Sequence, residues 1–181
     1  MEIKTYDPTE YDPIEQRKTK PKIEDILPLY LNDDNLLHAS DFIAFLRENK
    51  MNPGWRSPNS WCVSYKGKVL VYIKLSEAAY LNSEYDFLQI VFQNHFNDES
   101  KGLFIERFKE IAWSKVRYCN CCTDFKCAPG VQASILGKNL DNNICRHMSF
   151  LFNNPDAEEV ECIKMLIISC KESIIKNQRS I

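Results

Sequence analysis

The segment SWCVSYKGKVLVYIKL, residues 60–75, decides the fold that we expect for this chain. Apolar residues recur at every second position on both sides of a central Lys66-Gly67 pair: Trp61, Val63 and Tyr65 before it, and Val69, Val71, Ile73 and Leu75 after it. Alternation of this kind is typical of strands with one buried face, and Lys-Gly suits a two-residue turn. The segment therefore predicts an antiparallel β-hairpin.

Downstream of the hairpin, strand and helix patterns alternate. The run YDFLQIVF, residues 85–92, predicts a third strand because it is short and apolar, and MSFLF, residues 148–152, predicts another. Apolar residues at helical spacing predict a helix over residues 99–116. A last helix follows Asn154, which we expect to cap it, with Pro155 in its first turn. The buried seam predicted for this helix is Val160, Ile163, Ile167, Cys170 and Ile174.

Upstream of the hairpin, we expect helices and a leader. Residues 36–46 carry apolar side chains at steps of three and four, which predicts a helix, and a shorter helix begins near Ile23. The stretch NPGWRSPNS, residues 52–60, interrupts any helix because of its two prolines and its glycine. Residues 1–20 contain two Asp-Pro turns and few apolar residues, so we expect a flexible N-terminal arm.

These elements predict an α+β fold, with a small antiparallel sheet flanked by helices and a cysteine-rich loop. We expect a single domain over residues 21–181, with the loop at residues 119–147. A chain of 181 residues with 44% hydrophobic and 27% charged residues can bury a core, which excludes disordered and fibrous classes. The formal net charge of −2 gives no general attraction to nucleic acid, so no nucleic-acid partner is expected.

The start of the chain indicates a compartment. MEIKTYDPTEYDPIEQ lacks the basic start and apolar run of a secretory signal, and no run of about eighteen apolar residues occurs. We therefore expect a cytoplasmic protein with no membrane partner. Thiols stay reduced there, so the eight cysteines are interpreted as metal ligands, reactive groups or small core residues rather than disulfides. Cys62, Cys162 and Cys170 fit the last class.

Four cysteines fall within YCNCCTDFKC, residues 118–127. Cys119 and Cys122 form a C-x-x-C pair, Cys127 follows after four residues, and Cys145 stands farther along the chain. Zinc prefers four tetrahedral ligands, with thiolates at about 2.3 Å. This spacing predicts a structural zinc site made of Cys119, Cys122, Cys127 and Cys145.

Two further residues are alternative ligands of this site. Cys121 can replace Cys122, and His147 can replace one sulfur in a Cys3His site or donate a hydrogen bond to a thiolate. Four protein ligands leave no open position on the ion, so we expect the metal to hold the loop rather than to activate water. Three ligands plus a water molecule would restore a catalytic interpretation.

The function expected from these features is a small-ligand or protein-binding module of the cytoplasm, and the chain is not expected to be an enzyme. The alternative is a thiol-based redox protein or metal sensor, in which the clustered cysteines change state reversibly. A plainer interpretation is that the cysteines are unligated thiols in a loop.

Aromatic residues gather near the mouth of the hairpin. Trp55, Arg56, Trp61 and Tyr65 fall within eleven residues and predict an aromatic-walled ligand site with one cation. Trp61 is also a candidate for the core, because it alternates with Val63 on the predicted strand. Trp55 and Arg56 lie in the preceding loop, so they are the better candidates for a binding surface.

Two resemblances accompany this interpretation. Residues 55–75, with a tryptophan before an SW-x-V-x-Y-K-G-K hairpin, resemble small uncharacterised bacterial α+β domains of the YdhG and YjbR type. The run C-x-x-C-x4-C-x-P-G, followed by L-G-K-x-L and Cys145, looks like an uncharacterised group of Firmicute proteins. The first resemblance implies the α+β fold, and neither implies an activity.

Overall fold

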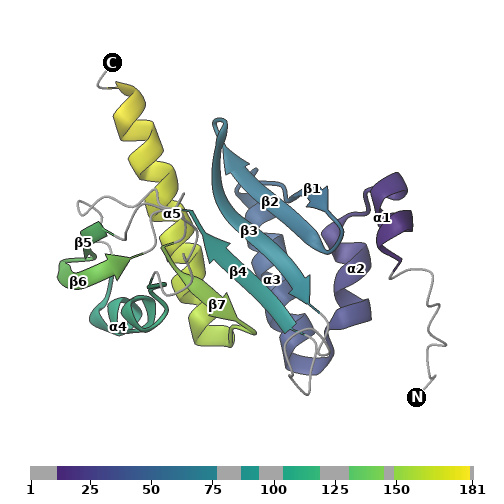
Figure 1. Ribbon diagram of the computed structural model, residues 1–181, viewed down its shortest axis with the longest axis horizontal. Helices are drawn as coiled ribbons and strands as arrows, with labels where there is room; N and C mark the ends of the chain where they lie inside the picture. Colours follow the sequence, from purple (N-terminus) through teal and green to yellow (C-terminus); the bar gives the residue numbers. More distant parts are fainter. Residues whose placement is uncertain (1–11, 77–86, 94–103, 119–130, 145–148, 180–181) are drawn as a thin grey trace.

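A computed structural model describes residues 12–76, 87–93, 104–118, 131–144 and 149–179 of the chain. Its helices are α1 (Pro13–Thr19), α2 (Ile23–Tyr30), α3 (Asp33–Glu48), α4 (Glu106–Ser114) and α5 (Ala157–Arg179). Its strands are β1 (Gly54–Ser57), β2 (Ser60–Tyr65), β3 (Lys68–Ser76), β4 (Phe87–Phe92), β5 (Val131–Ile135), β6 (Lys138–Ile144) and β7 (Leu151–Asn153). The predicted α+β fold is confirmed (Figure 1). The loop predicted over residues 119–147 is wrong in its middle part, because residues 131–144 form the paired strands β5 and β6. Residues 119–130 and 145–147 of this predicted loop lie outside the described residues.

The predicted hairpin forms strands β2 and β3. Trp61 of β2 pairs with Ile73 of β3, and both side chains are fully buried. Lys66 and Gly67 connect the strands with φ angles of 47° and 77°. Two consecutive positive φ angles are the geometry of a type I′ turn, whose twist matches that of the flanking strands. The turn sets the pairing of Tyr65 with Lys68, and a bulge between Val63 and Ser64 then shifts the register so that Trp61 meets Ile73.

The hairpin belongs to a five-stranded sheet of order β1-β2-β3-β4-β7, in which all neighbours are antiparallel. The third predicted strand, residues 85–92, is confirmed as β4. The strand predicted over residues 148–152 is β7, which begins at Leu151 rather than Met148. Phe150, just before β7, instead forms an isolated bridge with Val116. The local pattern located this strand but not its start.

One face of the sheet carries the core. Trp61, Ile73, Ile90 and Phe152 come from four neighbouring strands, and each is fully buried. Helix α3 contacts both α2 and α5, and α2 contacts β3. Figure 1 shows α2 and α3 behind the sheet, with α5 beside β4 and β7. Burial of these apolar side chains between sheet and helices is the main source of stability.

The opposite face of the sheet is partly open. Cys62 pairs with Tyr72, and Lys74 pairs with Gln89, so these four residues share one face of three strands. Lys74 is exposed and the other three are half-buried. An antiparallel sheet with one packed and one wetter face shows this alternation. This face is the surface that the hairpin presents outward.

The N-terminal region differs from the flexible arm expected over residues 1–20. Residues Pro13–Thr19 form helix α1, with Asp12 as its N-cap accepting a hydrogen bond from the Ile14 N–H at 2.8 Å. Gln16 of this helix is only 2% exposed. The fixed φ of Pro13 and the Asp12 cap favour the start of a helix, where the Asp-Pro pattern predicts only a turn. Residues 1–11 lie outside the described residues.

The last helix starts differently from the prediction. Asp156, not Asn154, caps α5, because its Oδ1 accepts a hydrogen bond from the Glu159 N–H at 2.8 Å. Asn154 instead accepts from the Leu88 N–H at 2.7 Å and thereby extends the pairing along β4. The predicted seam of α5 is confirmed, since all five of its residues are buried. Among the described helices, none combines the length and apolar character that spanning a membrane requires.

Helix α4 and a second hairpin, β5–β6, form a group at one end of the molecule, opposite α1 (Figure 1). Helix α4 covers part of the helix predicted over residues 99–116, and residues 94–103 lie outside the described residues. Trp113 of α4 donates its Nε1 hydrogen to the Ile135 carbonyl at 2.8 Å. Helix α4 in turn contacts α5. The hydrogen bond therefore links the β5–β6 hairpin, through α4, to the rest of the fold.

Candidate metal centre

The predicted zinc ligands Cys119, Cys122, Cys127 and Cys145 lie outside the described residues, as do the alternates Cys121 and His147. The structure therefore describes the chain on either side of these residues. Two segments carry them, residues 119–130 and residues 145–148. From the positions of the residues at both ends of each segment, we ask whether the four predicted ligands can bind one zinc ion.

The ends of these segments meet at Ile144. Val131, which follows the first segment, pairs with Ile144 in the β5–β6 ladder. Tyr118, which precedes the first segment, forms an antiparallel bridge with Ile144. Paired strands lie about 4.8 Å apart, so one residue brings both ends of the first segment together. Ile144 itself precedes the second segment.

The far end of the second segment is held by the same stretch. The Arg117 N–H donates to the Ser149 carbonyl at 3.0 Å, and Val116 forms a bridge with Phe150. The Leu151 N–H donates to the Lys115 carbonyl at 2.9 Å. We call residues 115–118, 131, 144 and 149–151 the Ile144 frame. The frame thus fixes all four ends of the two cysteine-bearing segments.

Covalent geometry limits how far the predicted ligands can lie from this frame. Cys119 is next to Tyr118 in the chain. Cys145 is next to Ile144, and Cys127 precedes β5 by four residues. Each residue advances the chain by at most about 3.6 Å, so four residues reach at most about 14 Å. These limits are compatible with a single site for the three cysteines.

The frame is anchored in the core. Ile144 is 1% exposed and Phe150 is fully buried. The Phe150 ring meets the Phe92 ring edge-on, with centroids 5.8 Å apart. Such aromatic contacts add to the stabilisation that burial provides. Lys115 forms an ion pair with Glu159, which ties the frame to α5.

A second ion pair joins α4 to the start of α5. Arg107 donates from both Nε and Nη2 to the Glu158 carboxylate, each at 2.8 Å. These hydrogen bonds hold the pKa of Glu158 below its ordinary value and raise that of Arg107. Both side chains are solvent-exposed, so their contribution to stability is small.

Of the three thiols that the structure describes, Cys162 and Cys170 behave as core residues, as predicted, whereas Cys62 is only half-buried and lies on the open face of the sheet. Cys162 is fully buried, and its Sγ donates to the Phe108 carbonyl at 3.4 Å. Burial raises the pKa of the Cys162 thiol to about 12, and burial also raises the pKa of Cys170. Both thiols therefore stay protonated near neutral pH, as expected for small core residues. Within the described residues, no group of three or more His, Cys, Asp or Glu side chains is placed to hold a metal ion.

The fold does not bring the four predicted ligand-binding residues together on one surface. Trp61 is fully buried, and its Nε1 donates to the Pro21 carbonyl at 3.0 Å. Trp55 pairs with Trp61 across β1 and β2 and is half-buried. The Trp55 indole nitrogen is enclosed and has no hydrogen-bond partner among the described residues. Trp61 therefore belongs to the core, which was the alternative for this residue.

Arg56 lies on the open face. Its guanidinium stands 4.8 Å from the centroid of the Tyr72 ring, and its Nη1 donates to the Tyr72 hydroxyl at 3.1 Å. The β1–β2 register shifts between Trp55 and Ser57, so Arg56 lies at a bulge and has no direct partner in the β1–β2 register. Sequence reasoning missed Tyr72, although its position in an alternating strand placed it on the face opposite Ile73.

Tyr65 lies at the far end of β2, beside the turn. The Lys66 ammonium is 5.9 Å from its ring centroid, and the Lys171 ammonium is 5.3 Å from it. Tyr65 thus shares an environment with α5 rather than with Trp55 or Arg56. No local signal identified Lys171, because its partner comes from a distant segment of the chain.

The arrangement provides a core-anchored frame at the ends of the cysteine-bearing segments and, elsewhere, an open sheet face with arginine and tyrosine. Neither feature identifies a reaction. Comparisons of the chain with profiles of protein families, with curated proteins and with solved structures found no match.

Proposed function

We propose that this chain is a binding module whose two cysteine-bearing segments are joined by one structural zinc ion. Cys119, Cys122, Cys127 and Cys145 would hold the ion, with Cys121 and His147 as alternates. The observation that supports this most strongly is the meeting of Tyr118 and Val131 at Ile144. This meeting supports a single site, because it holds the described residues that flank the cysteine-bearing segments close together.

The chemistry of the donor set favours zinc. Four thiolates suit a tetrahedral ion of intermediate softness, whereas magnesium and calcium prefer oxygen ligands. A full set of four protein ligands leaves no position for water or substrate. The ion would therefore support structure, and the chain would act by binding rather than by catalysis.

The frame also lowers the cost of closing the site. Bringing the ends of a flexible segment together costs entropy that grows with the logarithm of its length. The ladder and bridge at Ile144 already hold the ends of residues 119–130 together, so zinc need order only the short stretches between its ligands. The binding free energy of the metal is then available to stabilise the fold.

The binding surface of the module would be the open face of the sheet and its rim. Arg56 stacks on Tyr72 there, and Lys74 beside them is exposed. A cation stacked on an aromatic ring contributes hydrogen-bond donors and apolar area together, which suits a small ligand or a protein partner. We further propose that the chain works in the cytoplasm, where its thiols stay available for zinc.

Elemental analysis of the purified, reduced protein tests the zinc proposal. We expect about one equivalent of zinc per chain, with loss of the metal in Cys119→Ser and in Cys127→Ser. Cys62→Ser is the matched control, because Cys62 lies in β2 outside the predicted site, and it should retain zinc. Wild-type protein that is folded and free of metal would contradict the proposal. A single cysteine of native protein that alkylates much faster than the others would favour the redox alternative.

A further inference from the structure

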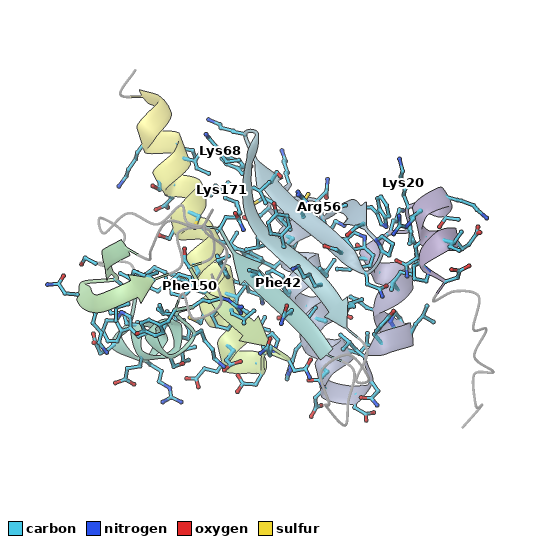
Figure 2. All side chains as sticks on the ribbon, in the orientation of Figure 1. Lys20, Phe42, Arg56, Lys68, Phe150 and Lys171 are labelled. Atoms are coloured by element: carbon cyan, nitrogen blue, oxygen red, sulfur yellow. The ribbon has the colours of Figure 1, made fainter. Side chains whose placement is uncertain are left out.

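Four residues gather where the tip of the β2–β3 hairpin meets α5. Lys66 and Lys171 both place their ammonium groups near the Tyr65 ring, at 5.9 and 5.3 Å from its centroid. Lys68 is the cross-strand partner of Tyr65. We call Tyr65, Lys66, Lys68 and Lys171 the lysine–tyrosine cluster. Figure 2 shows Lys68 and Lys171 near one another at the hairpin tip, away from Phe42 in the core.

Local structure explains the gathering. The type I′ turn projects Lys66 and Lys68 on either side of Gly67 at the end of a hairpin. Lys171 lies on α5 next to Glu172, on the margin of the buried seam, so its long side chain reaches across to the Tyr65 ring. Two cations close to one ring attract the ring but repel each other. The cluster is thus a local concentration of positive charge on a chain of negative net charge.

The charge environment of Lys68 and Lys171 differs from that of the lysines that form ion pairs. Lys115 pairs with Glu159, and Lys164 pairs with Asp41. Within the described residues, Lys68 and Lys171 have no carboxylate at ion-pair distance. Both ammonium groups are therefore available to an anion from outside, and such an anion would relieve the repulsion inside the cluster.

We propose that the lysine–tyrosine cluster is a docking surface for an acidic segment of a partner protein. The proposal rests on the role of the chain as a binding module, and it does not depend on the zinc site. Lysine ammonium groups are mobile point charges, which suit a run of carboxylates better than one fixed planar group. Complementary charge of this kind speeds encounter and orients the partner.

Nucleic acid fits this surface less well than an acidic polypeptide. Proteins that bind single strands offer open aromatic faces on which bases stack, inside a long cationic groove. Ammonium groups already stand beside the Tyr65 ring, and the net charge of the chain is −2. A short cluster with one half-buried ring that already lies near two ammonium groups therefore favours carboxylates over a chain of stacked bases.

Fluorescence anisotropy with a fluorescein-labelled deca-glutamate peptide tests the proposal on the full chain. We expect binding in 50 mM NaCl that weakens at least tenfold in 500 mM NaCl, because salt screens exposed charges. The double variant Lys68→Glu/Lys171→Glu should weaken binding at least tenfold in 50 mM NaCl. The control Lys22→Glu/Lys50→Glu changes the net charge equally at exposed lysines elsewhere, and it should weaken binding less than threefold.

Three outcomes would overturn the docking surface: no binding of the peptide, equal weakening in both double variants, or tighter binding of a ten-nucleotide oligouridine. The zinc content and thermal midpoint of every variant are measured in parallel. A folded, zinc-loaded protein that ignores the peptide would refute the docking surface and leave the zinc site standing. A folded, zinc-free protein that binds the peptide through Lys68 and Lys171 would refute the zinc site and support the docking surface.

Discussion

Gln16 and Asn59 lie 43 residues apart in the sequence and exchange two hydrogen bonds. The Gln16 Nε2 donates to the Asn59 Oδ1 at 2.7 Å, and the Asn59 N–H donates to the Gln16 Oε1 at 2.9 Å. Asn59 also donates from its Nδ2 to the Tyr30 hydroxyl. One asparagine in the β1–β2 turn therefore fastens both α1 and α2 to the sheet.

Gln16→Ala should lower the free energy of unfolding by about 1–3 kcal/mol, because it leaves two partly buried groups of Asn59 without partners. Urea denaturation measures the change. Arg17→Ala is the matched control on the same helix, since Arg17 is exposed, and it should change the free energy by less than about 0.5 kcal/mol. Equal effects of the two substitutions would show that α1 is not fastened through Gln16.

Lys164 joins α5 to α3. Its ammonium lies 2.7 Å from an Asp41 carboxylate oxygen and 2.6 Å from one of Glu161, and its side chain is only 14% exposed. We expect Lys164→Ala to destabilise the fold by about 1 kcal/mol, because it removes both ion pairs and the packing of the stem. Lys18→Ala breaks a pair with Glu15 whose lysine is 67% exposed, and it should cost about 0.3 kcal/mol. Thermal unfolding of both variants checks the order, and a larger effect at Lys18 would contradict it.

The elements that the sequence predicted correctly are those whose signal is local. The β2–β3 hairpin follows from period-two alternation around Lys66-Gly67, and the seam of α5 follows from its helical spacing. Asn154 was assigned to the wrong element because its hydrogen-bond partner, Leu88, lies 66 residues away. An asparagine next to a helix can either cap that helix or accept a hydrogen bond from a distant strand. The local sequence does not distinguish these two roles.

The candidate site divides in the same way. The spacing of Cys119, Cys122 and Cys127 is a local signal, so the ligand set could be proposed from the sequence. The Ile144 frame could not, because β6 reads KNLDNNI and carries no apolar alternation. The cluster at Tyr65 was missed because Lys171 reaches it only through the packing of α5 against the core.

Removing zinc should loosen one part of the fold. Treatment of reduced protein with a chelator at pH 7 should speed hydrogen exchange in residues 131–144, because the metal would stabilise the segments that the Ile144 frame holds. Exchange in residues 60–75 should change much less, since that hairpin lies in the main sheet. Mass spectrometry of peptic peptides reads both regions in one sample. If exchange in residues 131–144 stays unchanged when bound zinc is lost, the metal does not stabilise the Ile144 frame.

The turn at Gly67 supplies a third stability test. Gly67 has a φ of 77°, and a Cβ there would meet no atom within 4 Å. Gly67→Ala should therefore cost about 1 kcal/mol through backbone strain alone. Gly54→Ala is the control in the neighbouring strand, because its Cβ would lie 3.8 Å from the Cys62 carbonyl oxygen, an ordinary contact, without a positive φ. A cost at Gly54 that matches the cost at Gly67 would mean that the type I′ turn is not the cause.

The thiol of Cys162 should make stability depend on alkaline pH. Burial, together with the nearby charge of Glu159, raises its pKa from 9.0 to about 12. Below pH 9 the thiol is protonated in both the folded and the unfolded chain, so its contribution to the free energy of unfolding is fully present. Above pH 9 the unfolded chain releases the proton and the folded chain keeps it. Stability from this group is then lost at up to about 1.4 kcal/mol per pH unit until pH approaches 12.

Urea denaturation of wild type and Cys162→Ala between pH 7.5 and 10.5 isolates this effect, because the other titrating groups are common to both proteins. The wild type should be more stable at pH 7.5, since Cys162 fills space in the core, and the gap should shrink as the pH rises. Ile163→Val removes a buried methylene from the adjacent position without removing a titrating group, so its gap to wild type should stay constant. A Cys162→Ala gap that is equally constant would mean that the thiol ionises as readily in the fold as in the open chain.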